Sequence, residues 1–210
     1  MGTVTRDVSV GFTQRKFPAG THMCFVYDSE AERRRVIAGY LAAGVEAGER
    51  VAYFADAGTE GAIHWMAEAG VAATAIEEGG HVHVAVAEAE ATYCPGGRFS
   101  PEVMFETLRG FRAESDQAGY DGARVSGEMT WALRDIPGHE RLLEYEAKVT
   151  GVLAECEVTA ICQYDAAAWD GATLLHVLRV HPMMVVRGQV VENPFFMQPE
   201  DYLRTYIDAH

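Results

Sequence analysis

Short apolar runs of strand length alternate along this chain with longer segments whose apolar residues recur at helical spacing. The strand-like runs cover residues 23–27, 51–54, 81–86, 123–126 and 158–164. Helical spacing follows them, as in Val36, Ile37, Tyr40 and Leu41 after the first run. Consecutive parallel strands need such crossover helices, so the alternation predicts an α/β fold with a mainly parallel sheet flanked by helices. Near the C-terminus, Arg187-Gly188 separates two apolar runs, which predicts a hairpin.

The length and the continuity of this pattern indicate one domain. The chain has 210 residues, 49% of them hydrophobic, which suffices for a sizeable core. No internal repeat, low-complexity tract or linker interrupts the alternation of strands and helices. Residues 1–16 are polar and are expected to form an N-terminal leader, and residues 17–210 to form the α/β domain.

The charge balance excludes several classes of partner. The chain carries 17 Lys and Arg against 31 Asp and Glu, a net charge of −14, which repels nucleic acids and anionic lipid. We therefore expect no direct nucleic-acid partner and no membrane partner. No apolar run reaches the roughly 18 residues of a membrane helix, and residues 1–14 lack the apolar stretch of a signal peptide. A cytoplasmic location is expected, with the four cysteines reduced.

The segment from Tyr40 to Val51 resembles the stretch that follows the phosphate loop in RecA/KaiC-type ATPases. In those proteins glycine-rich backbone and a lysine hold the phosphates. Here the corresponding position reads Tyr27-Asp28-Ser29-Glu30-Ala31-Glu32, with no glycine, no lysine and three carboxylates. The resemblance implies a RecA-like scaffold that has lost its phosphate-binding loop, and we expect no hydrolysis of nucleoside triphosphates.

Six short motifs occur in a fixed order. They are His22-x-Cys24-x-x-Tyr27, Gly127-Glu128-Met129-Thr130-Trp131, Tyr145-Glu146, Cys162-Gln163-Tyr164-Asp165, His181-Pro182 and Asn193-Pro194-Phe195. Together they resemble the MEDS family, the methanogen/methylotroph, DcmR sensory domain, over roughly residues 17–197. The resemblance implies a sensory domain for a hydrocarbon-derived or one-carbon-type ligand, with a role in signal transduction and transcription regulation. Because no helix-turn-helix or kinase module is recognisable, output is expected through a separate regulatory protein, either a kinase or a transcription regulator. Formation of a homo-oligomer is left open.

A ligand pocket is expected beyond the carboxyl ends of the strands, where open parallel sheets bind their ligands. Tyr27, Glu128, Trp131 and Tyr164 would converge there if the strand order is RecA-like. Two tyrosines, a tryptophan and a carboxylate suit a small, partly apolar molecule with a polar group. In the alternative interpretation the aromatic residues only pack at the rim of the core. Glu128 could instead pair with Arg124 or Arg134, and Arg33-Arg34-Arg35 is expected to be a solvated helix face.

A second group of candidates combines cysteine and histidine. His22 and Cys24 lie two residues apart on a strand and therefore on one face, Cys162 is expected on the adjacent strand, and His181 follows the last helix. These four complete the predicted ligand-binding set and are the candidates for metal ligands. Their spacing matches no standard zinc motif, so we expect buried thiols and no bound metal or other cofactor. The pair His81 and His83 is expected to face water or a helix.

Three functions remain open at this stage. The leading hypothesis is a small-molecule sensory domain that is not an enzyme and has no catalytic residues. The first alternative is an enzyme built on the same scaffold, with Cys24 or Cys162 as nucleophile and His22 or His181 as base. The second alternative is a protein-interaction scaffold with a filled pocket and no ligand.

Overall fold

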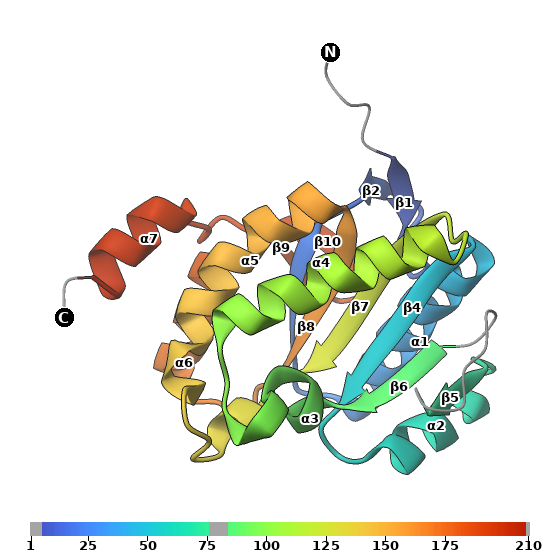
Figure 1. Cartoon of the computed structure of the whole chain (residues 1–210), viewed down its shortest axis with the longest axis horizontal. Coiled ribbons are helices and arrows are strands. Elements are labelled where there is room, and N and C mark those ends of the chain that lie inside the picture. Colours follow the sequence, from blue (N-terminus) through green and yellow to red (C-terminus); the bar gives the residue numbers. More distant parts are fainter. Residues whose placement is uncertain (1–5, 76–83, 209–210) are drawn as a thin grey trace.

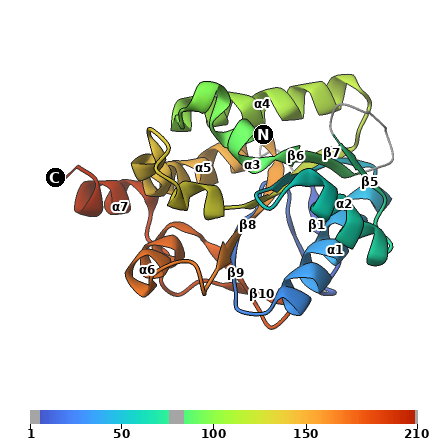
Figure 2. The same ribbon diagram turned by 90° about the horizontal axis from the view of Figure 1, so that it is seen from below.

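A central sheet with helices on both faces organises the chain (Figures 1 and 2). The computed structural model describes residues 6–75 and 84–208. Within these residues the eight strands of the sheet follow the order β10-β9-β3-β8-β7-β4-β6-β5. Every neighbouring pair is parallel except β9 and β10. The α/β class and the mainly parallel sheet predicted from the sequence are confirmed. The strands are β3 (His22–Tyr27), β4 (Glu49–Ala55), β5 (Ala73–Ala75), β6 (Val84–Glu88), β7 (Gly122–Glu128), β8 (Val158–Asp165), β9 (Met183–Val186) and β10 (Gln189–Glu192).

Helices cover the two faces of the sheet unequally (Figure 2). Helices α1 (Glu30–Glu46) and α2 (Thr59–Glu68) pack on one face. The opposite face is covered by α3 (Ala89–Tyr93), α4 (Pro101–Gln117), α5 (Leu142–Cys156) and α6 (Gly171–Val180). The last helix, α7 (Pro199–Tyr206), lies outside the sheet and buries Tyr202 against Ala147 of α5 and Val180 of α6. Among the described residues, no helix combines the length and the apolar character that crossing a membrane requires.

Local sequence signals set the ends of these elements. Ser29 and Ser100 accept hydrogen bonds from backbone N–H groups in the first turns of α1 and α4, and Asp170 does so for α6. The C-terminal hairpin is confirmed as β9 and β10. Its turn residues Arg187 and Gly188 have φ angles of 49° and 68°, and positive φ at both positions is what a tight two-residue turn requires.

The segment expected to be a polar leader is folded from Arg6 onward. Strand β1 (Asp7–Ser9) pairs with β2 (Lys16–Pro18) in an antiparallel hairpin. Its apolar residues Val8, Val10 and Phe17 are buried, so the polar composition of residues 1–16 concealed an alternation of buried and exposed positions. Gly11 (φ 78°) rests on α1 so closely that an added Cβ would collide with the carbonyl oxygen of Gly39. This hairpin packs against α1.

The register between β3 and β8 decides which side chains share a face. Cys24 lies opposite Cys162, and Val26 lies opposite Tyr164. Since side chains alternate along a strand, His22 points to the same face as these residues, towards α5. Tyr27 lies opposite Asp165 and has the other parity, so its side chain belongs to the face that α1 covers. The sheet thereby separates the residues that the sequence analysis had grouped into one pocket.

Candidate functional site

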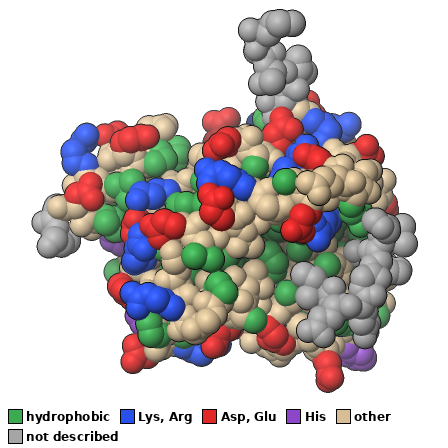
Figure 3. All heavy atoms as spheres, viewed as in Figure 1, with side chains coloured by type: hydrophobic (Ala, Val, Ile, Leu, Met, Phe, Trp, Pro, Cys, Tyr) green, Lys and Arg blue, Asp and Glu red, His purple; other side chains and the backbone are tan. Residues whose placement is uncertain are grey.

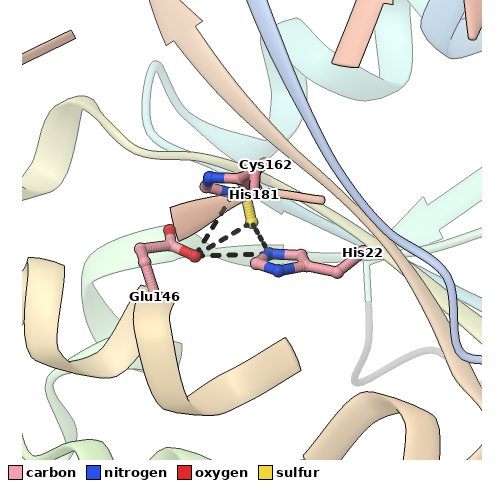
Figure 4. Close-up of side chains that lie close together, drawn as sticks. All are labelled: His22, Glu146, Cys162 and His181. Atoms are coloured by element: carbon pink, nitrogen blue, oxygen red, sulfur yellow. Dashed lines mark hydrogen bonds and ion pairs between the residues drawn. The ribbon is translucent and has the colours of Figure 1, made fainter. Parts of the chain in front are cut away.

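Four ionisable side chains from four different elements meet beneath α5 (Figure 4). His22 comes from β3, Glu146 from α5, Cys162 from β8, and His181 directly follows α6. All four are buried, and one potential ligand atom of each lies within 4.8 Å of those of the others. We call these residues the His-Cys-Glu cluster. Three of its members belong to the predicted ligand-binding set.

The Glu146 carboxylate is the point at which the other side chains meet. Its Oε2 atom lies 3.3 Å from His22 Nε2, 3.4 Å from His181 Nε2 and 3.7 Å from Cys162 Sγ. His22 Nε2 also lies 3.4 Å from Cys162 Sγ. The His22 and His181 rings are in contact, with centroids 4.1 Å apart. The cluster therefore brings two nitrogens, one sulfur and one oxygen around a common centre.

Surrounding groups fix the orientation of the cluster. His22 Nδ1 is hydrogen bonded to Thr150 Oγ1 at 2.9 Å, and Tyr164 donates its hydroxyl proton to Glu146 Oε1 at 2.6 Å. His181 Nδ1 lies 2.8 Å from the carbonyl oxygen of Val177. Because a carbonyl only accepts, Nδ1 of His181 carries the proton and Nε2 of the neutral ring carries a lone pair. That buried Nε2 atom has no hydrogen-bond partner among the described residues.

Burial dominates the electrostatics of the cluster. It lowers the pKa of His22 and of His181 to about 3, so both imidazoles are neutral at pH 7. It also raises the pKa of the Glu146 carboxyl, and it raises the pKa of the Cys162 thiol well above its usual range. No lysine or arginine of the described residues hydrogen bonds or forms an ion pair with Glu146. The site is a water-poor environment in which a carboxyl group faces two neutral imidazoles.

Glu146 was not among the predicted site residues, although Tyr145-Glu146 is one of the six motifs. Two signals could have found it. Glu146 is the one acidic residue at the buried helical spacing of α5, where Leu142 and Val149 lie one turn before and after it. An acidic residue in such a position is costly unless it has partners. Cys24, by contrast, was grouped with the cluster but does not join it, because its thiol donates to the carbonyl oxygen of Met183 at 3.7 Å.

The expected convergence of Tyr27, Glu128, Trp131 and Tyr164 does not occur. Tyr164 and Trp131 are fully buried on the α5 face, where Tyr164 holds Glu146 and Trp131 stacks on Tyr93 at 5.0 Å. Tyr27 lies on the other face and lines a surface groove between β3 and β9. Trp131 is thus a core residue, as the alternative interpretation held. The predicted residues do not converge because Tyr27 and Tyr164 have opposite parity on the paired strands β3 and β8, so their side chains lie on opposite faces of the sheet.

Glu128 belongs to a second buried network at the carboxyl edge of the sheet. Arg33 donates to Glu128 at 3.1 Å, to Tyr53 at 2.7 Å and to Gln163 at 3.1 Å. Tyr53 donates to the same carboxylate, whose other oxygen accepts the backbone N–H of Asp56 at 2.7 Å. The expected solvated role of Arg33 was wrong, because only 5% of this residue is exposed. Both carboxylate oxygens of Glu128 therefore accept hydrogen bonds from the protein, and the residue has a structural role at this edge of the sheet.

The other expected partners of Glu128 are engaged elsewhere. Arg124 forms a buried ion pair with Glu49, and Arg134 pairs with Asp56 at 2.6 Å. Both expected pairings of Glu128 were therefore wrong, since Arg33 takes that place. The pair His81 and His83 lies outside the described residues.

An apolar groove of about 700 Å³ opens between α4 and the strands β4 and β7. Hydrophobic side chains are visible in a hollow on this face of the molecule in Figure 3. Beneath it lies an inner cavity of about 10 Å³, next to the His-Cys-Glu cluster. His22 and Cys162 line this cavity, together with the aromatic residues Tyr93 and Tyr145. Three residues line both the groove and the inner cavity, namely Phe54, Leu108 and Val125.

The fold and the site together define an α/β domain of the RecA/KaiC-like type without a phosphate-binding loop and with a buried polar cluster beneath α5. The chain belongs to the MEDS family, described as the MEthanogen/methylotroph, DcmR Sensory domain, whose family model matches residues 21–182.

Two known proteins are similar to this chain. The transcriptional repressor DcmR of Methylorubrum extorquens is 24% identical over 161 residues, which is 76% of this chain and 57% of the repressor. The chain therefore spans little more than half the length of that relative. The crystal structure of the KaiC-like protein PH0186 from Pyrococcus horikoshii OT3 superimposes with a TM-score of 0.55 at 16% identity, over 86% of this chain and 80% of that protein. That likeness shows the fold.

Proposed function

We propose that this chain is a sensory domain that binds a small, weakly polar molecule in the groove beneath α4. The polar end of this molecule would contact the His-Cys-Glu cluster. Membership of the MEDS family and the similarity to a transcriptional repressor support a sensory or regulatory role. The family resemblance favours a hydrocarbon-derived or one-carbon-type ligand. Of the predicted ligand-binding residues, the proposal retains His22, Cys162, Tyr164 and His181.

The observation that carries this proposal is the shared lining of the groove and the inner cavity. Phe54, Leu108 and Val125 separate a surface groove from a cavity that touches His22 and Cys162. A groove of this size is typical of small-molecule sites, and a mainly apolar lining with a few polar groups is their usual composition. The inner cavity holds about one water-sized group. A ligand with an apolar body and a small polar end matches this combination.

The carboxyl edge of the sheet offers no comparable site for a nucleotide. Arg33, at the start of α1, is held by Glu30, Glu128, Tyr53 and Gln163, so its guanidinium is not available to a phosphate. The chain around the start of this helix supplies the carboxylates of Asp28, Glu30 and Glu32 where RecA-like ATPases supply glycines and a lysine. We accordingly propose that the domain neither binds nor hydrolyses nucleoside triphosphates.

The chemistry of the cluster argues against the enzyme hypothesis. Burial raises the pKa of the Cys24 thiol to about 12 and raises the pKa of the Cys162 thiol well above its usual range, so neither is a thiolate nucleophile at neutral pH. His22 and His181 have pKa values of about 3, far below that of an effective general base at pH 7. The groove argues against a scaffold without a ligand. We propose output through a separate regulatory protein, a kinase or a transcription regulator, since a net charge of −14 disfavours direct contact with DNA.

A substitution in α4 tests the groove without disturbing the fold. Gly110 lines the groove, and a Cβ added there would meet no atom within 4 Å. Gly110→Leu should therefore fill the groove, while the loss of a helical glycine stabilises the protein by about 1 kcal/mol. Gly151→Leu on α5 is the matched control, because Gly151 is an exposed helical glycine with the same open surroundings.

The assay is a panel of short alcohols, aldehydes, amines and halocarbons, with binding followed by chemical-shift changes in NMR spectra. We expect at least one compound to bind to the wild type and to Gly151→Leu, and to lose at least tenfold in affinity, about 1.4 kcal/mol, in Gly110→Leu. The proposal fails if no compound binds. It also fails if a bound compound retains its affinity in Gly110→Leu.

A further inference from the structure

Four of the distances between ligand atoms in the His-Cys-Glu cluster match the edges of a tetrahedron around an ion. Zinc lies at about 2.0–2.1 Å from nitrogen and oxygen ligands and at about 2.3 Å from sulfur. Tetrahedral angles then place N and O ligands about 3.3 Å apart, and place sulfur about 3.6 Å from each of them. The two N–O distances in the cluster are 3.3 and 3.4 Å. The distances to Cys162 Sγ are 3.4 Å from His22 and 3.7 Å from Glu146.

His181 supplies a second, independent observation. Its Nδ1–H donates to Val177, so the lone pair of Nε2 is directed into the cluster, where Oε2 of Glu146 lies 3.4 Å away. When the Glu146 carboxyl is ionised, two lone pairs face each other at 3.4 Å in a buried site and repel each other. Nε2 of His181 has no hydrogen-bond partner among the described residues. A cation between the two atoms would accept both lone pairs and remove this unfavourable contact.

The charge of the cluster also matches a divalent ion. Two neutral imidazoles, a thiolate and a carboxylate carry a total charge of −2, and within residues 6–75 and 84–208 no lysine or arginine pairs with them. A divalent ion would make the buried assembly neutral. It would also favour the ionised thiol and carboxyl, whose protons are released when the metal binds.

We propose that His22, Glu146, Cys162 and His181 bind one divalent transition-metal ion, of the zinc class, in four-coordinate geometry. Imidazole and thiolate ligands select such ions over calcium and magnesium, which prefer oxygen. The outer contacts are those that orient metal ligands: Thr150 on His22, Val177 on His181 and Tyr164 on Glu146. This inference goes beyond the proposed function, because metal binding requires no small molecule in the groove.

The test uses the full chain without an affinity tag, freed of metal by a chelator and titrated with Zn²⁺ or with Co²⁺ as a spectroscopic probe. We expect one equivalent to bind, and we expect the cobalt form to show the visible absorption of a tetrahedral site with a thiolate charge-transfer band. X-ray absorption at the zinc edge should give one sulfur and three nitrogen or oxygen neighbours. A wild-type protein that binds no stoichiometric metal, or whose bound zinc has no sulfur neighbour, overturns the proposal.

Substitutions identify the ligands. Cys162→Ser should remove the charge-transfer band, and Glu146→Gln should weaken zinc binding at least tenfold. Cys24→Ser is the matched control, since Cys24 faces the same side of the sheet but donates to Met183, and it should bind as the wild type does. Equal losses in Cys24→Ser and Cys162→Ser overturn the assignment. If Cys162→Ser does not fold, the wild-type absorption spectrum and Cys24→Ser decide. Metal binding and the Gly110→Leu assay are scored separately, so either proposal can fail alone.

Discussion

Acidification of the metal-free protein should expose the cost of its two buried, neutral histidines. His22 and His181 have pKa values of about 3 in the folded state because both are buried. In the unfolded chain the pKa of histidine is about 6.5. Between pH 6.5 and pH 3 the unfolded state therefore binds protons that the folded state does not. Because the unfolded state gains these protons, the free energy of unfolding of the metal-free protein falls as the pH falls from 6.5 to 3.

The magnitude follows from the number of protons. Each histidine contributes about 1.4 kcal/mol per pH unit, so the pair contributes at most about 2.7. Glu146 acts in the opposite direction, because burial raises its pKa and the folded state then holds a proton that the unfolded state has released. The wild-type slope should accordingly lie between about 1.4 and about 2.7 kcal/mol per pH unit from pH 4.5 to 5.5, where the histidines of the unfolded chain are almost fully protonated.

Urea unfolding, followed by tryptophan fluorescence at half-unit intervals of pH in the presence of a chelator, measures this slope. His181→Asn should reduce it by about 1.4 kcal/mol per pH unit, and Glu146→Gln should increase it towards about 2.7. His64→Asn on α2, where the side chain is 77% exposed, is the matched histidine substitution outside the cluster. A slope near zero in the wild type, or one that His181→Asn does not alter, refutes the electrostatic description of the cluster.

Two further predictions concern the framework around the site. Trp131→Ala should lower the free energy of unfolding by about 3–5 kcal/mol, because the ring is fully buried between Tyr93 and Phe99; a loss below about 2 kcal/mol in urea unfolding would instead indicate a ring that faces a cavity. Arg124→Met should lower the free energy of unfolding by about 3–5 kcal/mol, because it leaves the buried Glu49 carboxylate with Arg6 as its one remaining ion-pair partner among the described residues. The double variant with Glu49→Gln should recover part of that loss in the same assay, and no recovery would contradict a coupled pair.

The architecture was accessible from the sequence because it depends on local patterns. Alternating apolar runs, the capping residues Ser29 and Asp170, and the turn at Arg187-Gly188 each act within a few residues. The order of the central strands β3, β8 and β7 also agrees with the RecA-like expectation. Likewise, His22 and Cys162 were predicted site residues because the face of a strand follows from alternation once its neighbours are known. His181, which follows α6, was predicted from the family resemblance.

What the sequence could not provide is the register between strands distant in the chain. A shift of one residue moves a side chain to the other face of the sheet. The pairing of Val26 with Tyr164 therefore separates Tyr164 from Tyr27, and no local pattern encodes that pairing. Arg33 was misassigned for a related reason, because its acceptors Tyr53 and Glu128 come from distant strands. Long-range partners decide whether a charged residue is solvated or buried.

Anomalous diffraction from crystals of the zinc-loaded protein tests the central claim most directly. Data collected on both sides of the zinc edge locate the ion without reference to any substitution. We expect one strong anomalous peak at full occupancy, enclosed by Nε2 of His22, Nε2 of His181, Sγ of Cys162 and a carboxylate oxygen of Glu146. A zinc ion at full occupancy at another site, with no ion among these four side chains, would contradict the account.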